Sequence, residues 1–370
     1  MPVLIAAALA AASLVLGTSP APAAPSTPSP SGQPSLVVTV RDPRVSESSG
    51  LAASPTRPDL VWTVNDSGGS ATVLGISLRT GRAAAVLRLA DTQARDWEAM
   101  SAGVGADGTG LLWIGDVGDN RGVRESVVLR LVPEPRRLGA TTSAPVSLRV
   151  RYPGGPVDVE TLIWTPERRL LLVSKGLLGA VVYEVPQPAV TAALAGRSTS
   201  TPVLATRVAT VSQSLVTDGV ALPDGRIVLR GYQSAAVYAG LSGGGRLARL
   251  QSVPLPAQEQ GETVAVLDRG AALLVGSEGA GQPLWRVPIA AAAEPTSTPT
   301  QTPTQTSTQG STPTPTPTAA ATSTTPAPGR PEPQATPPPR ALLVVFFIGG
   351  IASLATILTR YQRQRRRRRR

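Results

Sequence analysis

Four acidic residues each open a similar short segment of the chain, followed by a small or β-branched residue and then an apolar one. These residues are Glu98, Glu160, Asp218 and Glu262. Carboxylates that lie within a few ångströms of one another repel, which raises their pKa values unless a cation neutralises them. Carboxylate oxygens suit a hard cation, Ca²⁺ above all. The four acids are therefore candidate Ca²⁺ ligands, with strand-end capping or pairing with arginine as the alternative.

A second group of polar residues follows short apolar runs that are typical of strands. This group contains Asp66, Asp116, Asp119, Asn120, Lys175 and Glu278. The cluster 116–120 has the oxygen-rich chemistry of a calcium loop, although it is too short for an EF-hand. Asx turns that end strands are the alternative. We interpret the whole group as candidate ligand-binding residues.

Lys175 is the only lysine in a chain that otherwise uses arginine. A lysine can be tuned by burial or offer a compact ammonium group, whereas arginine does not readily lose its proton. Lys175 is therefore the candidate catalytic residue, positioned to pair with the carboxylates or to contact an anionic ligand. A lysine without a function is the alternative.

The missing residue types exclude several kinds of chemistry. The chain has no Cys and no His, so a disulfide scaffold, a thiol nucleophile, a histidine zinc ligand and a Ser-His-Asp triad are all excluded. The formal charge is +11, but eight of the 35 basic residues lie between Arg360 and the C-terminus. The rest of the chain is close to neutral, so no nucleic-acid partner is expected.

The acidic segments belong to an internal repeat. Five apolar residues mark it, at intervals of 44 to 62 residues: Leu51, Met100, Leu162, Val220 and Val264. Each is followed by a turn and further short strands, and the one helix-like stretch is Ala189–Ala195. A period near 50 with about four strands per unit predicts an all-β fold, a β-propeller. We expect five blades, with six as the alternative, and we expect residues 35–40 to close the ring.

The sequence on either side of this domain predicts targeting and attachment. Residues 1–23 fit a signal peptide and 24–34 a flexible lead-in, before the propeller at 35–290. Residues 291–340 are rich in Pro and Thr and predict an extended stalk. The apolar run 341–359 predicts a transmembrane helix, and the arginines of 360–370 indicate a cytoplasmic C-terminus. These features predict a single-pass protein of the cell membrane with its propeller outside.

The domain resembles a family of secreted actinobacterial β-propeller proteins described as WD40-like, phytase-like or esterase-like. The resemblance rests on motifs that occur in order, among them SSGLAAS at 48–54, RDWEAM at 95–100, LWIGDVGDN at 112–120, RYPGGPVDVETL at 151–162 and QGETVAV at 260–266. It implies a propeller with acidic residues around its axis and bound calcium. That family often has a His where this chain has Val157, so the resemblance implies no histidine-dependent role here.

Two functional hypotheses follow. The first is a membrane-anchored extracellular propeller that binds a ligand or a protein partner through an acidic channel mouth with Ca²⁺. The second is a Ca²⁺-dependent hydrolase of phosphate or carboxylic esters, in which the metal polarises the substrate and a carboxylate activates water.

Overall fold

The protein is a five-bladed β-propeller in the computed structural model, which describes residues 32–66, 70–241 and 244–291. Five sheets surround a common axis, and each has four antiparallel strands, of which one is innermost. These inner strands are β2 (Ser48–Ala53), β6 (Trp97–Val104), β11 (Val159–Trp164), β16 (Val216–Ala221) and β21 (Gly261–Leu267). Each inner strand contacts the next around a ring, and β21 contacts β2. The predicted all-β propeller with five blades is therefore confirmed.

Three further strands complete each blade. The first blade adds β3 (Leu60–Asn65), β4 (Ser70–Ser77) and β5 (Ala83–Gln93), and the second adds β7 (Gly110–Asp116), β8 (Val127–Pro133) and β10 (Val146–Arg151). The third adds β12 (Leu170–Ser174), β13 (Ala180–Glu184) and β15 (Thr206–Val211), and the fourth adds β17 (Ile227–Gly231), β18 (Ser234–Tyr238) and β20 (Arg249–Pro254).

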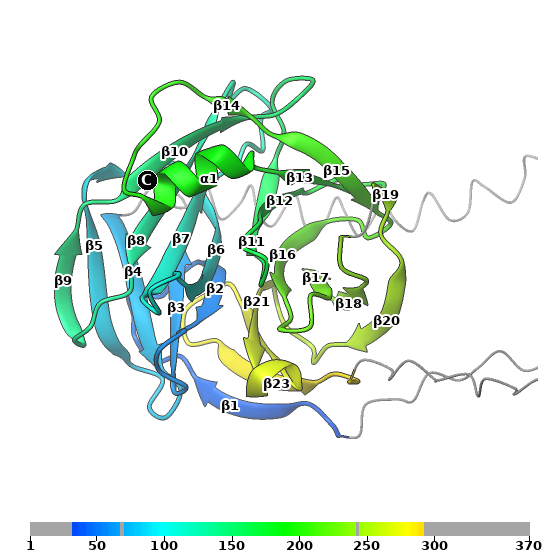
Figure 1. Ribbon diagram of the computed structural model, residues 1–370. Helices are drawn as coiled ribbons and strands as arrows, with labels where there is room; N and C mark the ends of the chain where they lie inside the picture. The colour runs from blue at the N-terminus through cyan, green and yellow to red at the C-terminus, as the bar shows by residue number, and fades with distance from the viewer. Residues whose placement is uncertain (1–31, 67–69, 242–243, 292–370) are drawn as a thin grey trace, which may run out of the picture. The chain divides into compact units, whose positions relative to one another are not determined.

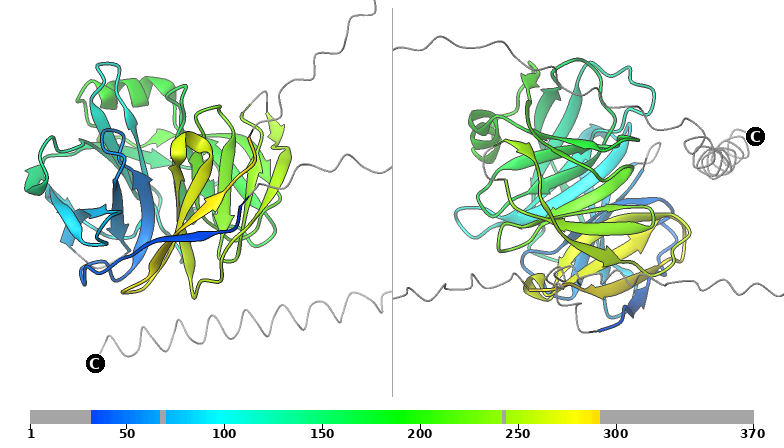
Figure 2. Two further views of the ribbon diagram at one scale, coloured as in Figure 1. Left: turned by 90° about the horizontal axis from the view of Figure 1, so that it is seen from below. Right: turned by 90° about the vertical axis from the view of Figure 1, so that its right-hand side faces the viewer.

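The fifth blade closes the ring with both ends of the propeller. It consists of β21, the short 3₁₀ helix η1 (Asp268–Gly270), β22 (Ala272–Ser277), β23 (Pro283–Pro288) and, as its outer strand, β1 (Ser35–Thr39). β1 runs antiparallel to β23, with Ser35 opposite Arg286. Figure 1 and the left view of Figure 2 show β1 in blue beside β23 in yellow. The predicted closure of the ring by an N-terminal strand is confirmed.

Three short strands that the sequence did not predict lie at the outer edges of the blades. β9 (Gly139–Ser143), β14 (Val203–Leu204) and β19 (Gly245–Arg246) each come from one blade and pair in parallel with the outer strand of the preceding blade. The helix α1 (Gln187–Leu194) leads into β14 and packs against β10, as Figure 1 shows. Each added strand covers a sheet edge that would otherwise offer free backbone groups.

The blades pack on one another through aliphatic and tryptophan side chains. Trp62, Trp97 and Trp113 are buried within these layers, as expected for blade packing. Near the axis the strands approach closely: a Cβ on Gly50 would lie 2.8 Å from the Met100 backbone nitrogen. That distance is shorter than van der Waals contact, so only glycine fits at this point of the first inner strand.

The segments predicted for targeting and attachment lie outside the described residues. These are the signal peptide 1–23, most of the lead-in 24–34, nearly all of the stalk 291–340, the helix 341–359 and the tail 360–370. In the part of the chain that the structure describes, no helix is both long and apolar enough to cross a membrane.

Candidate functional site

A β-bulge at the start of each inner strand sets the geometry of one channel mouth. The strand pairing of all five blades skips one residue at this point. The skipped residues are Ser49, Glu98, Glu160, Thr217 and Glu262. A bulge turns a side chain away from the regular alternation of its strand. The three glutamates thus occupy equivalent positions in the second, third and fifth blades.

Asp218 does not occupy the position that its sequence motif suggested. The bulge places Thr217 in register with the three glutamates, and Asp218 lies one residue deeper, opposite Arg230. One oxygen of Asp218 accepts the Gly219 N–H at 2.8 Å, and the other accepts the Val264 N–H of the next inner strand at 2.8 Å. Burial raises the pKa of Asp218 well above its usual range, although these N–H groups lower it. Asp218 thus joins its own inner strand to that of the fifth blade.

Lys175 lies among the three glutamates. Its Nζ is 2.8 Å from Oε1 of Glu160 and 5.2 Å from the ring centre of Tyr232. Burial alone would lower the pKa of Lys175, but the nearby acids Glu160 and Glu262 and the phenol of Tyr232 raise it well above its usual range. The ammonium group therefore stays charged. The predicted pairing of Lys175 with mouth carboxylates is present in the structure.

The carboxylates of Asp66, Asp96 and Glu98 form a compact cluster, with one oxygen of each within 4.8 Å of the others. Asp66 directly follows β3, the second strand of the first blade. Asp96 and Glu98 lie on either side of Trp97, which begins β6 in the second blade. Burial raises the pKa of Asp96 to about 6, with Asp66 adding to the rise. Burial also raises the pKa of Glu98 well above its usual range, with Glu160 and Asp66 adding to it. A Cβ on Gly118 would lie 2.7 Å from Cγ of Glu98, so glycine leaves room for the cluster.

Four further acids complete this mouth on the side of the third and fifth blades: Asp158, Glu160, Glu262 and Glu278. Burial raises the pKa of Glu160 to about 7, against the lowering effect of Lys175. Burial likewise raises the pKa of Glu262 well above its usual range. Gln260 donates a hydrogen bond of 3.0 Å to Glu262 and a second, short one to Glu278. We call the set Asp66, Asp96, Glu98, Asp158, Glu160, Glu262 and Glu278, with Lys175, the acidic mouth.

The predicted cluster at 116–120 is engaged in its own loop. Asp116 pairs with Arg124 at 2.8 Å, and the two oxygens of Asp119 accept the backbone N–H groups of Val123 and Arg124 at 3.0 and 2.8 Å. The Asp119 N–H in turn donates to Asp158 at 2.8 Å. Asn120 is exposed on the same loop. Asp116 and Asp119 thus hold the loop that supports Asp158, which corresponds to the Asx-turn alternative.

Sequence reasoning missed two side chains beside the mouth. Arg230 is fully buried and donates to the carbonyl oxygens of Thr263 and Gly276 at 2.9 and 3.0 Å, which joins the fourth and fifth blades. Burial lowers its pKa to about 10, opposed by nearby Glu262. Tyr232 follows β17 as Lys175 follows β12. The signal that would have found Tyr232 is this shared place directly after the second strand of a blade.

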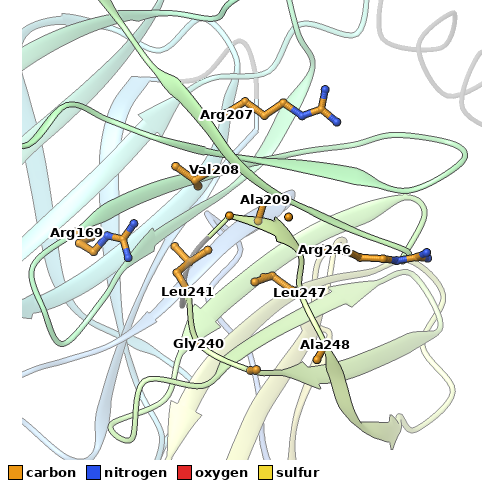
Figure 3. Close-up of a pocket in the computed structure, with 12 residues that line it drawn as sticks. Arg169, Arg207, Val208, Ala209, Gly240, Leu241, Arg246, Leu247 and Ala248 are labelled. Atoms are coloured by element: carbon orange, nitrogen blue, oxygen red, sulfur yellow. The ribbon is translucent and has the colours of Figure 1, made fainter. Parts of the chain in front are cut away.

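A hollow of about 480 Å³ lies elsewhere, against the outer part of the third and fourth blades. Figure 3 shows Val208, Leu241 and Leu247 around it, with Arg207 and Arg246 extending away from them. Arg169 on its other side is paired with Glu184 at 2.6 Å. Its polar groups do not converge on a common point, so we do not regard it as the functional site.

Fold and site together define a five-bladed β-propeller with an acidic channel mouth. No protein-family model matches the chain, and no curated protein matches it. Among solved structures, the chain is similar to the PQQ-bound aldose sugar dehydrogenase of Streptomyces coelicolor, at 14% identity over 70% of this chain and 99% of that one, with a TM-score of 0.38. It is also similar to a gluconolactonase from Xanthomonas campestris, at 12% identity over 71% and 98% of the two chains, with a TM-score of 0.38. The narrower resemblance to secreted actinobacterial propellers stays a prediction.

Proposed function

We propose that this chain is a cell-surface propeller that binds a divalent cation, Ca²⁺ above all, at its acidic mouth and recognises an external ligand or protein there. In this proposal the segment 341–359 anchors the chain in the membrane and the Pro/Thr-rich stalk holds the propeller outside. The proposal rests on the chemistry of the mouth, where acids from several blades converge on a small volume.

The observation that carries the proposal is the cluster of Asp66, Asp96 and Glu98. Three carboxylates within 4.8 Å of one another repel when all are charged. The cluster is therefore stabilised when it binds protons or a cation. Oxygen ligands from two different blades provide the irregular, oxygen-only coordination that Ca²⁺ accepts. At neutral pH and millimolar extracellular calcium, a cation competes well with protons for such a cluster.

Lys175 gives the mouth a second kind of recognition. Its ammonium group is paired with Glu160 and lies beside Tyr232, on the side of the mouth formed by the third and fourth blades. A ligand that carries a carboxylate or a phosphate can reach both a bound cation and this ammonium group. We therefore propose an anionic ligand or an acidic side chain of a partner protein as the recognised group.

Calcium titration of Glu98→Gln tests the proposal. This substitution keeps the shape of the side chain and removes its charge, and it should weaken Ca²⁺ binding by at least about tenfold in isothermal titration calorimetry. The matched control is Asp91→Asn, which removes a carboxylate from an exposed position on β5 and should leave binding unchanged. Unchanged Ca²⁺ binding by Glu98→Gln, or no binding by the natural chain, would refute the cation site.

The second candidate function is a Ca²⁺-dependent hydrolase of phosphate or carboxylic esters. It is favoured by Glu160, whose pKa of about 7 lies in the range in which a carboxyl group can exchange a proton during catalysis. Lys175 next to it would stabilise negative charge that develops on the substrate. Calcium-dependent turnover of p-nitrophenyl phosphate or acetate, lost in Lys175→Met, would establish this function, while no turnover across a broad ester panel leaves the binding function.

A further inference from the structure

The end of the channel opposite the acidic mouth is an open hollow with a different chemistry. It has a volume of about 760 Å³ and is lined by the last residues of all five inner strands and by the turns that follow them. A volume of this size matches the pockets that hold small organic molecules. None of its lining residues belongs to the acidic mouth, so the two ends of the channel carry separate sites.

The walls of this hollow are mainly apolar and stiff. Val104, Leu222 and Leu267 contribute aliphatic surface, and four prolines stand in the surrounding turns. Trp164 forms part of the lining and lies directly over Gly103, where a Cβ would be only 2.4 Å from its ring. Proline and a fixed indole keep the hollow in one shape before a ligand arrives, which lowers the entropy cost of binding.

The charge at the rim of the hollow is positive. Of the three arginines that line it, Arg57 is held by the carbonyl oxygens of Pro135 and Arg136 at 3.0 and 2.7 Å. Arg168 and Arg269 are exposed, and within the described residues neither guanidinium group has a hydrogen bond or an ion pair. The only acid in the lining, Asp268, is paired with Arg286 at 2.6 Å. Two cationic groups therefore remain available to a ligand.

Arg168 occupies a backbone position that equivalent turns of the same molecule give to glycine. Its φ is +60°, and its N–H bonds back to the third residue before it. The matching turns of the second and fourth blades have Gly108 at +78° and Gly225 at +84°, each with the same hydrogen bond. An arginine in this left-handed region is less stable than a glycine there. The strain is consistent with a use for the side chain that the fold itself does not require.

We propose that this hollow binds an amphiphilic organic anion, with an apolar or aromatic body against Trp164 and an anionic head on Arg168 and Arg269. Apolar walls take up the body of such a ligand, and guanidinium groups form charge-assisted hydrogen bonds to a carboxylate or a phosphate. The proposal does not rest on cation binding at the acidic mouth. The hollow takes up the ligand whether or not Ca²⁺ is present.

Photolabelling of the full chain tests this site. The probe is 4-benzoylbenzoate, an aromatic carboxylate that crosslinks on illumination, and the control probe is 4-(aminomethyl)benzophenone, which has a similar shape and the opposite charge. We expect the anionic probe to label residues 53–61, 78, 102–104, 164–168, 221–223 and 266–269 at least tenfold more than the cationic probe, as read by mass spectrometry. Excess decanoate should suppress the labelling.

Arg168→Gly separates ligand binding from folding. It should reduce labelling by about tenfold, because one charge-assisted contact is lost, and raise the thermal midpoint by about 2–4 °C, because strain is relieved. Arg88→Gln, at an exposed site on β5, should change neither, and Glu98→Gln at the acidic mouth should leave labelling intact. Equal labelling by both probes, labelling away from these lining residues, or full labelling of Arg168→Gly would each overturn the proposal. A lower thermal midpoint of Arg168→Gly would overturn it as well.

Discussion

Replacing Asp96 by Asn should change the stability of the propeller with opposite signs in chelator and in calcium. Burial and the neighbouring Asp66 raise the pKa of Asp96 from 3.8 to about 6. A carboxyl group with a raised pKa in the folded state contributes stability that is complete at low pH. That stability is lost as the pH rises through the folded pKa, because the folded protein then holds a charge that it disfavours. Asn holds no such charge.

The size of the effect follows from the two pKa values. For a pKa of 3.8 in the unfolded chain and about 6 in the folded protein, raising the pH from 5 to 8 removes about 1.4 kcal/mol of stability. Solvent reaches part of the Asp96 side chain, and screening reduces this to about 1 kcal/mol. In chelator, Asp96→Asn should thus be more stable than the natural chain at both pH values, with an advantage that is about 1 kcal/mol larger at pH 8 than at pH 5.

Calcium should reverse this order. A cation present at a thousand times its dissociation constant stabilises the folded state by about 4.1 kcal/mol. The natural chain gains this stability, whereas Asp96→Asn lacks one of the three clustered carboxylates and loses most of it. At pH 8 in saturating calcium, the variant should therefore be the less stable of the two by more than about 1 kcal/mol.

Urea unfolding followed by tryptophan fluorescence measures these differences on the full chain, because all five tryptophans lie in the propeller. The exposed control Asp91→Asn should follow the natural chain in both buffers. A variant of Asp96 that is destabilised in chelator at pH 8 would refute the pKa argument. If Asp96→Asn gains as much stability from calcium as the natural chain, Asp96 is not a ligand of the cation.

Two further substitutions test side chains that join the blades. Asp218→Ala leaves two buried N–H groups without an acceptor. It should lower the free energy of unfolding by about 2–3 kcal/mol, equally in calcium and in chelator. A loss of stability only in calcium would instead indicate that Asp218 binds the cation. Arg230→Met removes the donor to two buried carbonyl oxygens and should lower the free energy of unfolding in urea by about 3 kcal/mol. The exposed control Arg88→Met should change it by less than about 0.5 kcal/mol. Equal effects of the two substitutions would refute the role of Arg230 in joining the fourth and fifth blades.

The architecture could be predicted because the sequence repeats a pattern of apolar residues and turns once per blade. Leu51, Met100, Leu162 and Val264 follow the bulge of their strands at the same distance, so their spacing gave the correct number of blades. The outer strands β9, β14 and β19 were not predictable in this way. They are two to five residues long and pair with a different blade from the one that surrounds them in sequence, so no local pattern marks them.

The candidate site was predictable in part, and its errors have a physical cause. Glu98, Glu160 and Glu262 were identified from their place in the repeat, and Lys175 from its residue type. Asp218 sits in a similar motif, but the bulge of its strand falls at Thr217, one residue earlier. A shift of one residue along a strand turns a side chain to the other face, and the sequence contains no sign of where a bulge falls.

The layer between the two channel mouths decides whether they act together. The first paired residue after each bulge is buried in all five blades, as Ala99, Thr161, Asp218 and Thr263 illustrate with 0% exposure. Asp218 hydrogen-bonds to two inner strands within this layer. This buried layer separates the acidic mouth from the arginine-rimmed hollow. We therefore expect a cation at one end and an organic anion at the other to bind as independent ligands, and coupling between them would require the blades themselves to move.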